Sequence, residues 1–214
     1  MAESLAWQAD VFKACGKQME SIQTTAAALR LLENIHETDV FASRARLLAH
    51  WAESAALLGE RTVMEEKLSA STELLGQCEG NDEFGAAIWR LYRGTCSLYI
   101  GDVVSADTCL EQALRELRPD LLHQRASAVL LQTQARLTLR DLKGTLETLR
   151  TAVPLVVATN SLLLDRGLMD LTERFMTTFP RNGDVRDAVR EIQHHPQLCT
   201  LPTRHIPRYL EAQL

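Results

Sequence analysis

Apolar side chains recur at intervals of three or four residues along most of the 214-residue chain. The first such run, which predicts one face of an amphipathic helix, consists of Trp7, Val11, Cys15, Met19, Ile22, Ala26 and Leu29. Gly16 lies inside this run, so the pattern allows either one long helix or a hairpin of two. Thr38 or Asp39 then offers a side-chain oxygen that caps the next helix. Residues 1–38 are therefore predicted to form an N-terminal helical cap.

Beyond Phe41 the same periodicity predicts a series of helix pairs. Expected helices cover residues 41–58, 62–75, 86–100, 104–117, 122–139 and 142–153, and a less regular pair covers 161–178 and 185–194. Glycines at the expected ends of several helices support these limits. The turns within pairs recur after 42 residues, from Gly59 to Gly101, and after 39 residues, from Gly101 to Arg140. This recurrence is typical of a helical repeat in which each pair packs on the next.

Composition agrees with an all-α fold. Hydrophobic residues make up 46% of the chain, and Leu and Ala supply most of them. Leu, Ala, Arg, Glu and Gln are good helix formers. Only 10 Gly and 6 Pro occur, and a β-rich chain of this size would need more turn residues.

The segment from Ile88 to Asp120 resembles a tetratricopeptide repeat. That motif places a small residue on the first helix, a Gly-Asp-like turn, and small and large apolar residues in alternation on the second helix, since small residues allow close helix approach. The matching positions are Gly94, Gly101, Asp102, Ala106, Leu110 and Ala113, with Pro119 just past the helix end. The neighbouring pairs match less well, so the resemblance covers roughly residues 41–155.

This resemblance implies a right-handed superhelix, or solenoid, of antiparallel helix pairs with about 9–11 helices in one domain over residues 1–214. Within that domain, residues 41–155 would form three pairs and residues 161–194 a divergent pair. Residues 195–214 would form a C-terminal tail with a short capping helix. The chain is also similar to the sensor portion of bacterial transcription regulators that contain such repeats. It shows no helix-turn-helix, so DNA binding is not expected with the resemblance.

In tetratricopeptide solenoids the first helix of each pair lines a concave groove, which implies a binding surface here. The positions concerned are Arg46, Ala49, Glu53 and Ala56; Ile88, Leu91, Thr95 and Tyr99; and Ser127, Leu130, Gln134 and Leu137. This mildly apolar set with a few polar groups is the profile of a groove for a peptide or a small molecule. Some of these residues would instead pack against neighbouring helices.

Charge argues against nucleic acid as a main partner. The net charge is −5 and the sequence pI is about 5.7, so the chain lacks the overall positive field that attracts phosphates. Arginine greatly outnumbers lysine. Genomic base composition explains this bias most simply, and an arginine-lined pocket for carboxylates or phosphates is the functional alternative.

No catalytic, cofactor or metal motif stands out. Walker, G-x-S-x-G and H-E-x-x-H patterns are missing from the sequence. His194, His195, Cys199 and His205 carry zinc-binding groups, but their spacing matches no common zinc motif and a solvated tail explains them better. His50 is isolated and is expected to have a surface or helix-end role. Five scattered cysteines, the lack of a signal peptide and the lack of a membrane-length apolar run indicate a cytoplasmic protein.

The favoured hypothesis is a non-enzymatic module that binds a peptide, a small molecule or a partner protein in the concave groove, in bacterial regulation. Under it, Glu53→Arg or Tyr99→Ala would abolish binding while leaving the fold nearly intact. A helical enzyme or biosynthetic accessory protein with a pocket between repeats is the first alternative. A structural scaffold that dimerises through its terminal helices is the second. No catalytic residue, cofactor or metal is assigned, and no membrane contact is expected.

Overall fold

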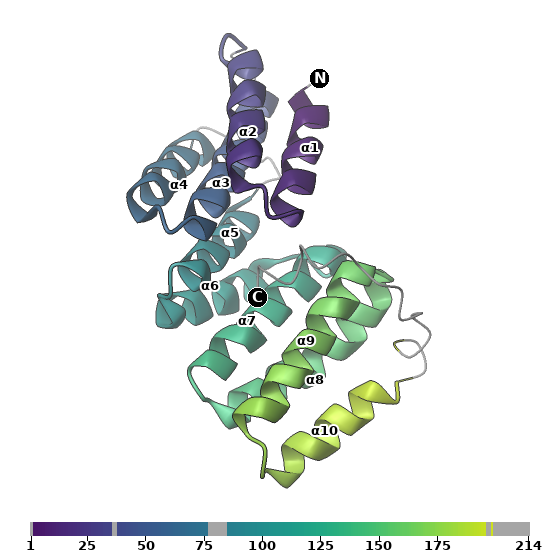
Figure 1. Ribbon diagram of the computed structural model, residues 1–214. Helices are drawn as coiled ribbons and strands as arrows, with labels where there is room; N and C mark the ends of the chain where they lie inside the picture. The colour runs from purple at the N-terminus through teal and green to yellow at the C-terminus, as the bar shows by residue number, and fades with distance from the viewer. Residues whose placement is uncertain (1, 36–37, 77–84, 196–197, 199–214) are drawn as a thin grey trace. The chain divides into compact units, whose positions relative to one another are not determined.

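The computed structural model describes residues 2–35, 38–76, 85–195 and 198, and over these residues the chain is all-helical, without strands. Ten helices follow one another in this part of the chain (Figure 1): α1 (Ala2–Ala14), α2 (Gln18–Leu32), α3 (Thr38–Leu57), α4 (Arg61–Leu75), α5 (Ala86–Tyr99), α6 (Val103–Glu116), α7 (Leu122–Thr138), α8 (Leu142–Thr159), α9 (Leu162–Thr178) and α10 (Gly183–Gln193). The all-α prediction is confirmed. No helix in the described ranges is both long and apolar enough to span a bilayer.

Most helix limits fall within one to three residues of those expected from the sequence. The first run of apolar residues is a hairpin, because the chain turns between α1 and α2 at Gly16, where φ is +74°. Gly59 and Gly101 end α3 and α5 with φ values of +76° and +82°. Glycine adopts this left-handed conformation without the clash that a Cβ atom would cause. At the corresponding turn after α7, Arg140 takes φ +58° in place of a glycine.

The expected end of α8 near residue 153 is wrong. The helix continues through Pro154 to Thr159 and ends where Asn160 adopts a left-handed conformation. A proline within a helix removes one main-chain hydrogen bond, and its ring crowds the preceding turn. Packing compensates here, since Ala152 and Val156 on either side of the proline are fully buried.

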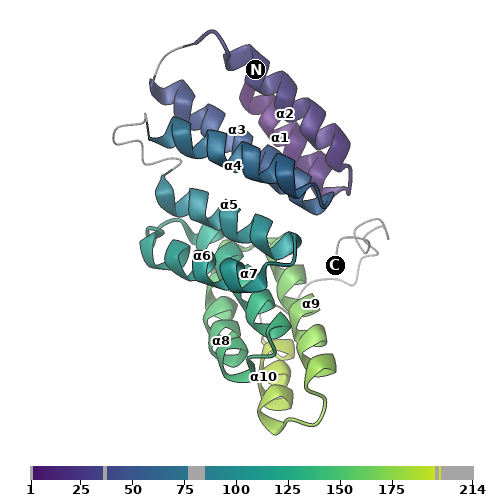
Figure 2. The ribbon, with the colours of Figure 1, turned by 90° about the vertical axis from the view of Figure 1, so that its left-hand side faces the viewer.

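The described chain forms two compact units, which meet in sequence between Asp102 and Val103. In the first unit, α1 packs on α2 and α3 packs on α4, as two consecutive helix pairs (Figure 2). The first helices of successive pairs also touch, because α3 contacts both α1 and α5. Contact between the first helices of consecutive pairs is the packing expected of stacked helix pairs.

Small residues dominate the packing of α3. Ala42, Ala45, Ala49 and Ala52 are buried, and the Ser71 hydroxyl of α4 donates a hydrogen bond of 2.8 Å to the Ala45 carbonyl oxygen. A side-chain bond to a helix backbone requires the two helices to lie close together. Alanines permit this approach because they project little beyond the helix backbone.

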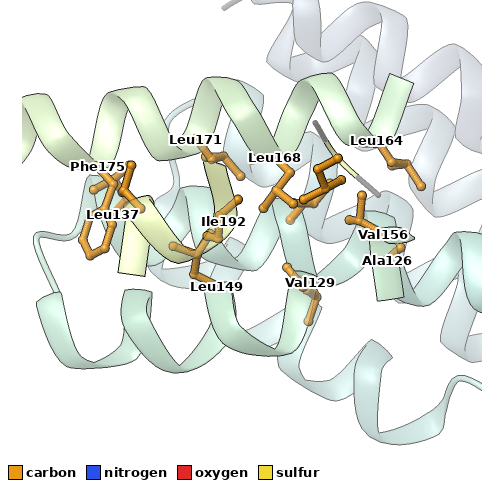
Figure 3. Packing of buried hydrophobic residues seen from close by; sticks show 14 of the residues in the cluster. Ala126, Val129, Leu137, Leu149, Val156, Leu164, Leu168, Leu171, Phe175 and Ile192 are labelled. Atoms are coloured by element: carbon orange, nitrogen blue, oxygen red, sulfur yellow. The ribbon is translucent and has the colours of Figure 1, made fainter. Parts of the chain in front are cut away.

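The second unit has a larger aliphatic core. Helices α7, α8, α9 and α10 all contribute to it, and Figure 3 shows their apolar side chains pointing toward one another. Leu168 and Phe175 of α9 are almost completely buried, as are Leu149 and Val156 of α8. Helix α10 adds a buried stripe that ends at Ile192.

The finer architecture stays a prediction. Helix-pair packing is present within each unit, but the right-handed tetratricopeptide superhelix and the single-domain organisation are not tested by it. The repeat-like segment Ile88–Asp120 extends across the unit boundary, with α5 in the first unit and α6 in the second. The expected capping helix near the C-terminus, after Pro207, lies outside the described residues.

Candidate functional site

Ionisable side chains from three successive first helices meet in the first unit. Asp10 and Lys13 come from α1, His50 and Glu53 from α3, and Tyr92 from α5. We call these five residues the polar cluster. On α1 and on α3 the two members are three residues apart, which places them on the same face of their helix.

Lys13 forms the ionic centre of the polar cluster. Its ammonium nitrogen lies 2.5 Å from Glu53 Oε2 and 3.4 Å from Asp10 Oδ1. The Lys13 and Glu53 side chains are only 18% and 13% exposed, whereas Asp10 is 39% exposed. The ion pair between α1 and α3 is therefore largely buried, and Asp10 forms its solvent-facing edge.

His50 connects Asp10 to Tyr92 through both of its ring nitrogens. Nδ1 lies 2.9 Å from Asp10 Oδ1, and Nε2 lies 2.8 Å from the Tyr92 hydroxyl oxygen. The His50 and Tyr92 rings also meet edge-on, with centroids 5.0 Å apart. With a proton on Nδ1 the ring donates to Asp10, and Nε2 and the Tyr92 hydroxyl share the second hydrogen bond.

The surroundings hold these groups in defined charge states. Burial raises the pKa of Tyr92, which keeps the phenol protonated. Burial disfavours the charged form of Lys13, but the charges of Glu53, Tyr92 and Asp10 and the hydrogen bond to Glu53 together outweigh burial, so the pKa of Lys13 rises. Burial likewise acts to raise the pKa of Asp10, yet the hydrogen bond and charge of His50, together with Lys13, bring it below its ordinary value. Lys13 and Asp10 are thus both ionised at neutral pH.

Cys96 lies on α5 one turn beyond Tyr92 and is completely buried. Burial, followed by the negative charge of Glu53, raises the pKa of its thiol. Since the thiolate is the reactive form of cysteine, this side chain has the character of a packed hydrophobic group.

The structure divides the predicted groove residues between the two units. On α3, Glu53 belongs to the polar cluster and Arg46 lies one turn before His50. Tyr99 of α5 is 37% exposed. The positions with buried side chains are Ala49, Ala56, Leu91 and Thr95 in the first unit and Leu130 and Leu137 in the second. Those with partly buried side chains are Ile88, Ser127 and Gln134.

Sequence reasoning missed four of the five members of the polar cluster. The surface role expected for His50 is wrong, since this residue is buried and bonded at both nitrogens. The spacing of apolar residues predicts that Trp7 and Val11 lie on the buried face of α1, which leaves Asp10 and Lys13 off that face. These two apolar residues are instead 73% and 60% exposed. The signal available in the sequence was the small pair Ala6 and Ala9, which is buried on the Lys13 side of α1.

Within the described ranges, no group of three or more His, Cys, Asp or Glu side chains is arranged to hold a metal ion. His194 and His195, which begin the candidate zinc segment, follow α10. Cys199 and His205 lie outside the described residues.

Comparison with known proteins adds no relative. No protein-family model, no curated protein and no solved structure matches this chain. The resemblance to tetratricopeptide repeats therefore continues to depend on the residues named in the sequence.

Proposed function

We propose that this chain is a non-enzymatic binding protein that recognises a peptide, a small molecule or a partner protein on the face formed by α1, α3 and α5. The observation that supports this proposal is the polar cluster itself, to which three successive first helices contribute. Replacing a buried ion pair by apolar residues of similar volume is often neutral or stabilising. A charged cluster at this position is therefore poorly explained by stability alone.

The electrostatics of the polar cluster favour binding over catalysis. An Asp–His–hydroxyl chain also occurs in enzymes, where the histidine activates a nucleophile. Here the pKa values of Tyr92 and Cys96 are both raised by burial, so neither side chain is activated. Asp10, which is partly exposed and ionised, is instead suited to accept hydrogen bonds from a ligand.

The tetratricopeptide family and a role in bacterial regulation belong to the same proposal. Their support is the sequence resemblance together with the contacts that join the first helices α1, α3 and α5. In repeat proteins of this kind, consecutive first helices supply the side chains of an extended binding surface.

Native mass spectrometry of the purified protein tests the proposal, because it detects a ligand or partner that stays bound. We expect a bound species on the wild-type chain and its loss, or a weakening of about tenfold, in Asp10→Asn, which removes a charge without changing size. Glu20→Gln on α2 is the matched control, since Glu20 is exposed and outside the polar cluster.

The control variant should retain the bound species. A wild-type chain that carries no ligand and takes none up from fractionated bacterial extract would contradict the proposal. Equal loss of the bound species in Asp10→Asn and in Glu20→Gln would show that the ligand does not bind at the polar cluster.

A further inference from the structure

Two buried N–H donors in the first unit have no acceptor among the residues that the structure describes. They are Arg46 Nε on α3 and the indole Nε1 of Trp89 on α5. Most buried donors in folded proteins have a partner, because losing hydration without a replacement is unfavourable. Two such donors on adjoining helices therefore need an explanation.

The helices that carry the two donors, α3 and α5, pack against each other. Trp89 and Tyr92 pack against Ala42, Ala45 and Ala49 of α3. Arg46 directly follows Ala45 in the same helix. Burial raises the pKa of Tyr92, and Arg46 lies close enough for its positive charge to act against this rise.

Among the residues that the structure describes, the acidic side chains of the polar cluster are bonded elsewhere. Glu53 is paired with Lys13, and Asp10 is engaged by His50 and Lys13. Trp89 also contacts Arg93, whose guanidinium carbon lies 5.4 Å from the centre of the indole ring. This contact adds a second positive charge without adding an acceptor.

Donor chemistry then defines what would fit. Indole and guanidinium groups donate hydrogen bonds and accept none, and the guanidinium is permanently charged. Their complement is an oxygen that accepts hydrogen bonds and carries negative charge. We propose that Arg46 Nε and Trp89 Nε1 bind an anionic oxygen of the ligand, as in a carboxylate or a phosphate. This inference rests on the proposed function and specifies the charged group that the ligand carries.

The side-chain NMR signal of the Trp89 indole N–H reports directly on this site. The chain has three tryptophans, and Trp89→Phe identifies the signal of Trp89. Sodium acetate and sodium phosphate are titrated separately, with sodium chloride at matched ionic strength as the reference. We expect acetate, phosphate or both to move the Trp89 signal in a saturable way. Trp7, which is exposed, and Trp51, which lies under Lys67, serve as internal references.

Substitutions of Arg46 assign the response to the donor pair. Arg46→Met removes both the donors and the charge at similar length and should abolish the saturable shift, whereas Arg44→Met on the same helix should retain it. Arg46→Lys keeps the charge without the fixed Nε–H and should weaken anion binding by about tenfold. This second variant keeps the test decisive if Arg46→Met fails to fold.

Three results would overturn the inference. One is a Trp89 shift no larger than that with chloride, another is a shift that survives in Arg46→Met, and the third is unchanged anion affinity in Arg46→Lys. If neither anion binds while a cellular ligand is still lost in Asp10→Asn, only this inference fails. Anion binding without any cellular ligand would support the site and count against the proposed function.

Discussion

Single residues of the polar cluster depend on their partners more than on their own helices. The Lys13 ammonium nitrogen lies 2.5 Å from Glu53 Oε2, and both side chains are largely buried. Each therefore neutralises the charge of the other where water is mostly excluded. This pairing changes how Glu53 can be tested. Glu53→Arg would bring a guanidinium against the Lys13 ammonium and disturb the fold together with any binding. Asp10, at the exposed edge, separates the two effects better.

Removing one partner of the Lys13–Glu53 pair should destabilise the protein. Lys13→Met alone leaves Glu53 buried without its counter-charge, and we expect it to lower the free energy of unfolding by roughly 3 kcal/mol. Adding Glu53→Met in the same chain should recover most of this loss. Urea denaturation of the two single variants and the double variant measures the coupling. Additive losses in the double variant would show that the two charges do not depend on each other.

Asp10 should make the free energy of unfolding depend on pH in the acidic range. Its pKa is lowered in the folded chain, so the folded state favours the carboxylate. The stabilisation from Asp10 is then fully present above its unfolded pKa of about 3.9 and is lost as the pH falls through the lower folded value. Wild type should exceed Asp10→Asn in unfolding free energy at neutral pH, and the difference should shrink below about pH 4. A difference that stays constant to the lowest pH at which both fold would contradict this assignment.

Several helices of this chain end at a residue in the left-handed backbone conformation. Gly59 and Gly101 take the left-handed conformation after α3 and α5, and the sequence predicted both ends because glycine is the residue suited to that conformation. At α8 the local rule failed. Pro154 should have ended the helix, but buried neighbours on both sides carry it on to Thr159. Packing outweighs local preference when the interrupted helix has a long apolar face.

Two substitutions at the turns after α5 and α7 test how much the left-handed conformation costs. Gly101→Ala adds a Cβ that meets no atom within 4 Å, so only its backbone conformation, at φ +82°, opposes the change. We expect a loss of about 1 kcal/mol in unfolding free energy. Arg140→Gly relieves a side chain at φ +58° and should gain less than about 1 kcal/mol, because glycine also loses more entropy on folding. Thermal unfolding checks the opposite signs, and changes of the same sign would contradict the backbone explanation.

At the scale of the whole molecule, the two compact units differ in how they are held together. The second unit has a continuous aliphatic core over α7, α8, α9 and α10. In the first unit, the buried apolar residues fall into smaller clusters, in which alanines predominate. The polar cluster lies in this first unit, where charged groups take the place of part of an apolar interior. A surface that combines close helix packing with charged side chains is suited to selective recognition.

The sequence by itself determined the all-α class, the helix pairs and most helix ends. These features depend on the spacing of apolar residues and on turn residues such as Gly59 and Gly101, whose preferences act over a few neighbours. All of the expected groove residues also lie on the helices in which the sequence placed them, namely α3, α5 and α7.

The tertiary structure alone decided which residues meet. His50 lies 37 residues from Lys13 and 42 from Tyr92 along the chain, so no local pattern shows that they touch. Their meeting depends on how far each helix is rotated about its axis. For α1 the apolar pattern gave the wrong rotation: Ala6 and Ala9 allow close packing and bring Lys13 inward, while Trp7 remains exposed. Contact between distant segments is set by the fit of whole helix surfaces, which hydrophobic spacing does not encode.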